Sequence, residues 1–171
     1  MVSRTKTTFT ALILTGLFAI PAGAADLDTS ALLDIVEGIT VTEGTALNFG
    51  DVALNNGTMT VATDGGVTDP NFLSFDAANV SQGIFTIGAI AGSAYDISIT
   101  ETVPVVGVIL DNFTINIDGA ADEVGANSFV GVTLTAASST LNLGGDLTVD
   151  SATASLGANQ TIGYRVSVNF N

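Results

Sequence analysis

Apolar and polar side chains alternate along much of this 171-residue chain, and the last eleven residues, TIGYRVSVNFN, show the pattern most clearly. A period of two places alternate side chains on opposite faces of a β-strand. Helical periodicity is nearly absent from the rest of the chain after its first segment, so we predict an all-β protein. The apolar side of this last strand is formed by Tyr164, Val166, Val168 and Phe170.

Glycine, asparagine and aspartate clusters divide the chain into short predicted strands. Asn55-Asn56-Gly57 is typical of a hairpin turn that returns through residues 58–63, and Asp64-Gly65-Gly66 indicates another turn. Gly144-Gly145 is expected to lie in a loop, and residues 120–126 are the one stretch that suits a helical turn. Roughly ten short strands with regular turns predict an antiparallel β-sandwich. The later strands are expected over residues 84–87, 94–100, 105–110, 113–117, 129–135, 140–143, 147–149 and 162–170.

A membrane-spanning outer-membrane barrel is a competing all-β interpretation, suggested by the aromatic residue next to the C-terminus. Such barrels need strands of about 9–11 residues and aromatic girdles at both membrane interfaces. The chain has two tyrosines, no tryptophan and mostly shorter predicted strands. The sandwich is therefore the favoured fold, and the barrel is the minor alternative.

Residues 1–24 have the pattern of a signal peptide. Arg4 and Lys6 precede an apolar run over residues 9–20, Pro21 ends the run, and small residues follow up to Ala24. We therefore expect secretion to the periplasm, the cell surface or the medium, with no membrane span after cleavage. The mature chain is expected to hold an N-terminal strand or extension over residues 25–43 and a sandwich domain over residues 44–171.

The charge of the mature chain restricts its partners. Removal of the signal peptide leaves Arg165 as the one cation against 17 acidic residues. Such a surface repels nucleic acid and anionic lipid headgroups, so we predict no nucleic-acid partner. Proteins, neutral sugars and cations remain as candidate partners.

Catalytic chemistry finds little support in the sequence. The absence of histidine and cysteine removes the usual general base, nucleophile pairs and zinc sites. We expect no enzymatic activity and no cofactor. Asp118, Asp122 and Glu123 are weak candidates for a calcium site, because hard cations prefer oxygen ligands, although Asp118-Gly119 is also an ordinary turn pair.

Several short motifs, taken in order, carry a resemblance to a known family. They are Asn48-Phe49-Gly50, Phe85-Thr86-Ile87-Gly88, Tyr95-Asp96-Ile97-Ser98-Ile99, Phe113, Leu143-Gly144-Gly145-Asp146-Leu147 and the C-terminal run from Gly163 to Asn171. Over residues 33–171 the chain resembles the bacterial "domain of unknown function" family numbered 4402. The resemblance implies a small, secreted, β-rich protein with no established catalytic activity.

A looser similarity is to the pilins of chaperone–usher fimbriae, which also end in an alternating strand with a penultimate aromatic residue. In that immunoglobulin-like architecture an extension of the next subunit completes an incomplete sandwich. The resemblance implies a donor stripe here of Leu33, Ile35, Ile39 and Val41. The partners that it implies are further copies, other surface proteins and a periplasmic chaperone. The alternative is that residues 33–43 pair as an ordinary first strand of their own domain.

Two functional hypotheses follow. The leading one is a secreted structural or surface protein that acts through protein–protein contacts, as in a fimbria-like or cell-surface assembly. Its candidate contact residues are the donor stripe and the apolar face of the last strand. The alternative is a monomeric β-sandwich module that binds carbohydrate or calcium through its loops.

Overall fold

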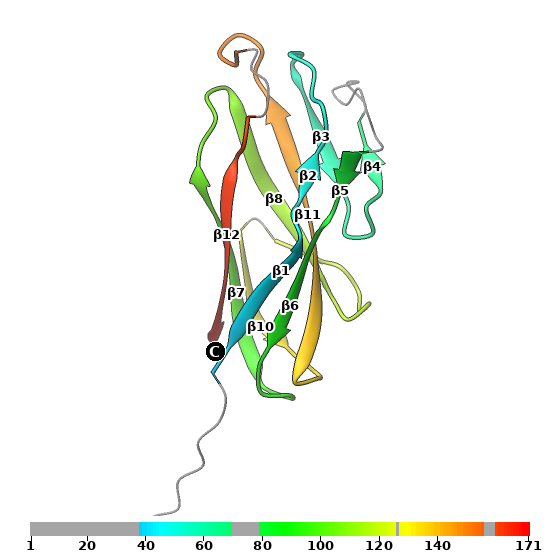
Figure 1. Cartoon of the computed structure of the whole chain (residues 1–171), viewed down its shortest axis with the longest axis vertical. Coiled ribbons are helices and arrows are strands. Elements are labelled where there is room, and N and C mark those ends of the chain that lie inside the picture. The colour runs from blue at the N-terminus through cyan, green and yellow to red at the C-terminus, as the bar shows by residue number, and fades with distance from the viewer. Residues whose placement is uncertain (1–37, 70–78, 126, 156–159) are drawn as a thin grey trace, which may run out of the picture. The chain divides into compact units, whose positions relative to one another are not determined.

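The computed structural model describes residues 38–69, 79–125, 127–155 and 160–171, which form strands and turns without an α-helix (Figure 1). In this described part of the chain, no helix is long and apolar enough to cross a bilayer. The strands are β1 (Thr40–Thr45), β2 (Asn48–Phe49), β3 (Gly57–Val61), β4 (Val67–Thr68), β5 (Val80–Ser81), β6 (Gly83–Gly88), β7 (Ala94–Val103), β8 (Val108–Ile117), β9 (Glu123–Val124), β10 (Ser128–Thr133), β11 (Ser138–Val149) and β12 (Gly163–Phe170).

The larger sheet is built around β11, whose twelve residues pair with neighbours on both edges. One edge pairs with β8 along almost its whole length, from Leu141 opposite Ile117 to Val149 opposite Val108. The other edge is shared: its first half pairs with β6 and its second half with β3. Outside these strands, β1 pairs with β6, β4 with β3, and β9 with β8, all antiparallel.

The smaller sheet has the order β10-β7-β12 and packs against the larger one, so the described chain is an antiparallel β-sandwich. Alternate residues of β7, β8 and β11 point into the shared core. Full burial of one such aliphatic or aromatic side chain stabilises a fold by roughly 1.5–3 kcal/mol. Members of the core with almost no exposed surface include Ile87, Tyr95, Ile97, Ile99, Phe113, Ile115, Leu134, Leu141 and Leu143.

The prediction that Gly144-Gly145 forms a loop is wrong, because both glycines lie inside β11 and are buried. A Cβ on Gly144 would collide with the Val61 carbonyl oxygen at the end of β3. A Cβ on Gly145 would lie 3.1 Å from Cδ1 of Phe113. The two glycines therefore let a neighbouring backbone and a core ring approach the central strand closely.

Three other local predictions also need correction. Residues 105–110 do not form a separate strand. Val105-Val106-Gly107 is a turn, and β8 begins only at Val108. The break that we expected at Asp111-Asn112 is absent, because β8 continues through these residues to Ile117. A β-bulge with Asn112 at φ 46° allows this continuity. Asn55-Asn56-Gly57 does not close a hairpin, because β2 before it pairs with β5 and β3 after it pairs with β11. The helical turn expected within residues 120–126 is also wrong, since β9 lies there.

The Asp64-Gly65-Gly66 turn is a confirmed prediction. It joins β3 to β4, with Val61 opposite Val67. Gly65 has φ 82°, and the Asp64 carboxylate accepts a hydrogen bond of 2.8 Å from the Gly66 N–H. This arrangement matches the turn chemistry of aspartate followed by glycine.

We expect Gly144→Ala to lower the free energy of unfolding by about 1–3 kcal/mol, because the added methyl group has no space beside Val61. Urea denaturation followed by circular dichroism measures the change. Gly38→Ala is the matched control, since a Cβ on Gly38 meets no atom within 4 Å. Equal midpoints for the two variants would contradict the close approach of β3 to β11.

Candidate interaction surface

The C-terminal strand β12 is hydrogen-bonded to β7 along one of its two edges. It pairs with β7 without interruption from Tyr164 opposite Glu101 to Phe170 opposite Tyr95. Within the part of the chain that the structure describes, no strand pairs with its other edge. A regular row of backbone N–H and C=O groups therefore faces away from β7, and such a row is a template for another extended chain.

Side chains on β12 follow the alternation seen in the sequence. Tyr164, Val166 and Val168 pack against the main core, whereas Arg165 lies exposed on the opposite face. Phe170, the last residue of the predicted apolar side, is less buried: its ring centroid lies 5.0 Å from that of Tyr95, but 54% of the residue stays exposed. The end of the strand thus presents an aromatic surface beside a free edge.

Other edge strands in the described chain are shorter or irregular. β4 and β9 have only two residues each. β10 carries a register shift between Phe129 and Val132, and β1 carries one between Glu43 and Thr45. Short strands and bulges are common devices against unwanted pairing, so β12 is the least protected of these edges.

The first strand belongs to the sandwich of its own chain. β1 pairs with β6 from Thr40 opposite Gly88 onwards, which places residues 40–45 in the larger sheet and puts the expected domain boundary at 43/44 inside β1. Of the donor stripe, Ile39 packs against the main core and Val41 is 38% exposed. Leu33 and Ile35 lie outside the described residues.

β1 and β12 lie side by side at one lateral side of the sandwich, without a backbone ladder between them (Figure 1). The hydroxyl of Tyr164 connects the two sides of this seam. It accepts a hydrogen bond of 3.0 Å from the N–H of Leu47 and interacts with the carboxylate of Glu43 in β1. The Tyr164 ring also meets Phe85 of β6 edge to face at 6.3 Å. One side chain therefore ties the last strand to the start of the fold.

The environment of the Tyr164 hydroxyl raises its pKa above the ordinary value of 10.0. Burial is the largest cause, because it disfavours the charged phenolate. The Leu47 N–H lowers the pKa by stabilising the phenolate, while the Glu43 carboxylate raises it by charge repulsion and by its hydrogen bond to the neutral form. The neutral hydroxyl is thus the form that suits the folded seam.

Sequence reasoning missed the roles of Glu43 and Leu47. Leu47 and Tyr164 are 117 residues apart, and neither Glu43 nor Leu47 belongs to a motif that indicates contact with the last strand. Only the packing of the two sheets brings them together. Tyr164 itself was found through the alternation of the strand, but its hydrogen bonds were not.

The three calcium candidates lie in separate local arrangements. The Asp118 carboxylate accepts a 2.7 Å hydrogen bond from the Thr140 N–H, and that of Asp122 accepts one of 2.8 Å from the Thr63 hydroxyl. Glu123 is exposed on β9. Among the described residues, no group of three or more aspartate, glutamate, histidine or cysteine side chains is arranged to hold a metal ion.

We expect Tyr164→Phe to cost about 1–2 kcal/mol of stability near neutral pH, because the Leu47 N–H loses its partner. The pKa of Tyr164 is higher in the folded state than its unfolded-state value of 10.0. The stability that the neutral hydroxyl contributes is therefore fully present below pH 10.0, and it is lost as the pH rises through the folded-state pKa. The gap in stability between wild type and variant should therefore narrow above pH 10.0. Urea denaturation across this range measures it, and a constant gap would contradict the assigned role of the hydroxyl.

Comparisons with known proteins give one match. The model of the family described as "Domain of unknown function (DUF4402)" matches residues 39–170, which contain every strand described above. No curated protein and no solved structure matches the chain. Because the match extends over most of the sequence, from β1 to the end of β12, the chain belongs to the DUF4402 family.

Proposed function

We propose that this protein is a secreted structural component of a cell-surface or fimbria-like assembly, and that it works by protein–protein contact at the free edge of β12. The predicted signal peptide supports export. The lack of histidine and cysteine and the dispersed carboxylates give no support to catalysis. An extended segment of another chain adds to β12 and continues the smaller sheet.

The observation that carries the proposal is the regular edge of β12 that no other described strand pairs with. Seven consecutive residue pairs, from Tyr164 to Phe170, hold the strand in unbroken register with β7. An added strand gains main-chain hydrogen bonds along this length, and its alternate side chains meet the seam between β12 and β1. Arg165, Ser167 and Asn169 lie on the outer face of β12, and Phe170 at its end is 54% exposed, so these side chains are available to flank the new strand.

The incoming segment is the N-terminal extension of a second copy, over residues 25–37. Because residues 40–45 pair with β6 of their own chain, the donor must lie upstream of β1. Leu33 and Ile35 in this segment have the alternation that a strand with one apolar face requires. Glu37 lies on the same face of such a strand as Leu33 and Ile35. The buried part of the strand must therefore end before Glu37, or the Glu37 carboxylate must remain in water. A periplasmic chaperone is expected to cover the same edge before assembly.

We expect the mature protein to associate as its concentration rises, and Ser167→Asp with Asn169→Asp to weaken association at least tenfold. Charged side chains on an edge strand disfavour pairing with another strand, and the new carboxylates also repel the acidic residues of the incoming segment, which include Asp34 and Glu37. The matched control is Thr86→Asp with Ser138→Asp, which adds equal charge at exposed positions of interior strands. Sedimentation velocity measures association. A wild-type protein that remains monomeric, or equal losses in both variants, would contradict the proposal.

We expect deletion of residues 26–37 to remove association while leaving a folded monomer, because β1 is retained and its pairing with β6 is intact. A synthetic peptide of residues 25–37 should then bind the truncated protein, and the aspartate substitutions in β12 should abolish that binding. Fluorescence anisotropy of the labelled peptide measures it. Unchanged association of the truncated protein would exclude this segment as the donor.

A further inference from the structure

Arg165 lies exposed on the outer face of β12, and it is the one cation that remains after the predicted signal peptide is removed. Among the described residues, no carboxylate forms an ion pair with it. The residue opposite on β7 is Thr100, which carries no charge. Within the described chain, this charge is therefore available to a carboxylate of an incoming strand.

The hydrogen-bond pattern of β12 determines how closely a side chain of that strand can approach Arg165. The Asn171 N–H, directly after β12, donates a 3.2 Å hydrogen bond to the Ala94 carbonyl oxygen of β7. Backbone groups alternate in direction along a strand, so those of Arg165, Ser167 and Asn169 also point to β7. In an antiparallel strand on the other edge, the residue opposite Arg165 therefore forms a non-hydrogen-bonded pair with it. Such pairs have Cα atoms about 4.5 Å apart and the closest side chains.

The proposed donor segment, residues 25–37, carries a matching carboxylate. Asp34 lies between Leu33 and Ile35, so in an extended strand its side chain points to the face opposite theirs. When these two apolar side chains cover the partly buried apolar side of β12, Asp34 lies on the outer face, which is also the face of Arg165. Charge and alternation thus agree on the partner of Arg165.

We infer that Arg165 pairs with Asp34 of a second copy and so fixes the register and direction of the added strand, an inference that rests on the proposed function. The apolar neighbours of Asp34 then lie opposite Tyr164 and Val166. Opposite charges on directly opposed residues stabilise a strand pair, and like charges destabilise it. Asp28 shares the face of Asp34, but its pairing with Arg165 would move those apolar neighbours past the start of β12.

Glu37 distinguishes the two possible directions of the added strand. In the antiparallel register, Glu37 lies beyond Gly163, the first residue of β12, and its carboxylate stays in water. In the parallel register it would lie beside Val168, which packs against the core and where an unpaired carboxylate is costly. The antiparallel direction is therefore favoured.

This direction also requires a second copy. β1 runs opposite to β12 (Figure 1), and the hydrogen bond between Leu47 and Tyr164 places the end of β1 beside the start of β12. A donor antiparallel to β12 thus runs parallel to β1 of the acceptor. Parallel neighbouring strands need a connection of about a dozen residues or more, whereas four residues separate Ile35 from Thr40. The segment of the same chain is too short to make this pairing.

Disulfide cross-linking of the full mature chain tests the register, because the sequence contains no cysteine. In the inferred register Leu32 lies opposite Ser167, and the Cα spacing of such a pair suits a disulfide. We expect Leu32→Cys with Ser167→Cys to give a ladder of covalent multimers on a non-reducing gel after oxidation with diamide, because each copy donates to the next. Ser30→Cys with Ser167→Cys is the matched control, two residues out of register. Equal ladders, or a disulfide within one chain only, would overturn the inference.

Charge exchange separates the ion pair from net charge. We expect Arg165→Asp to weaken self-association about fivefold in sedimentation velocity, and the addition of Asp34→Arg to restore it. Adding Asp28→Arg instead gives the same net charge and should not restore association. A wild-type chain that stays monomeric would contradict the proposed function and the inference together. Association that Arg165→Asp leaves unchanged, or equal restoration by Asp28→Arg and Asp34→Arg, would overturn the ion pair alone and leave assembly through β12 intact.

Discussion

The backbone hydrogen bonds on both edges of β11 are the constraint on which this fold depends. One strand of twelve residues aligns β8 on one side and divides the other side between β6 and β3. β6 and β3 can share this edge only because residue 144 is a glycine: a Cβ there would collide with the Val61 carbonyl oxygen at the end of β3. Without cysteine in the sequence, strand pairing and the packed core must supply the stability that disulfides give many small secreted domains.

Among the described strands, β12 is a regular strand with one partner. In the same part of the chain the smaller sheet ends at β12 and the larger sheet ends nearby at β1, so the outer edges of these two strands face a common seam that Tyr164 bridges. A register shift interrupts β1, whereas β12 keeps an unbroken register with β7 over the length that would receive another strand. In the proposed function, the edge that folding leaves unused becomes the surface for assembly.

Alternation in the sequence was enough to predict the sandwich class, the last strand and the inward positions of Tyr164, Val166 and Val168. It failed where one residue type has two physical uses. Glycine pairs usually mark turns, but Gly144-Gly145 serves close packing inside a strand. Asp111-Asn112 looks like a break between strands, yet Asn112 tolerates positive φ and lets β8 continue through a bulge.

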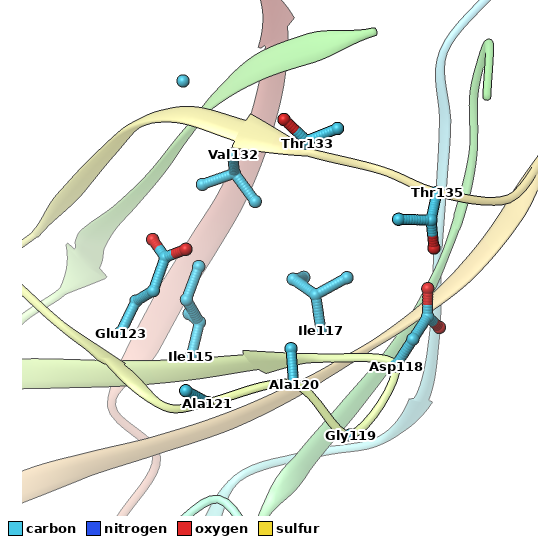
Figure 2. A pocket seen from close by; sticks show the side chains of 11 residues that line it. Ile115, Ile117, Asp118, Gly119, Ala120, Ala121, Glu123, Val132, Thr133 and Thr135 are labelled. Atoms are coloured by element: carbon cyan, nitrogen blue, oxygen red, sulfur yellow. The ribbon is translucent and has the colours of Figure 1, made fainter. Parts of the chain in front are cut away.

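Long-range features left no local signal. The contact of the Tyr164 hydroxyl with Leu47, and a groove of about 460 Å³ between β8 and β10, arise only after the sheets pack. Asp118 and Glu123 were noted as oxygen ligands for calcium because they are close in sequence. The structure instead places Glu123 beside Ile115 and Asp118 beside Ile117, with these buried side chains between them (Figure 2), an arrangement that spacing along the chain does not reveal.

Amide hydrogen exchange along β12, followed by NMR in dilute and in concentrated protein, is the most direct measurement of the central claim. If the outer edge of β12 is the assembly surface, its amides that point away from β7 exchange rapidly in the monomer and become protected upon association, while those bonded to β7 are protected throughout. Protection of the outward amides in the dilute monomer, or association that leaves them unprotected, would contradict it.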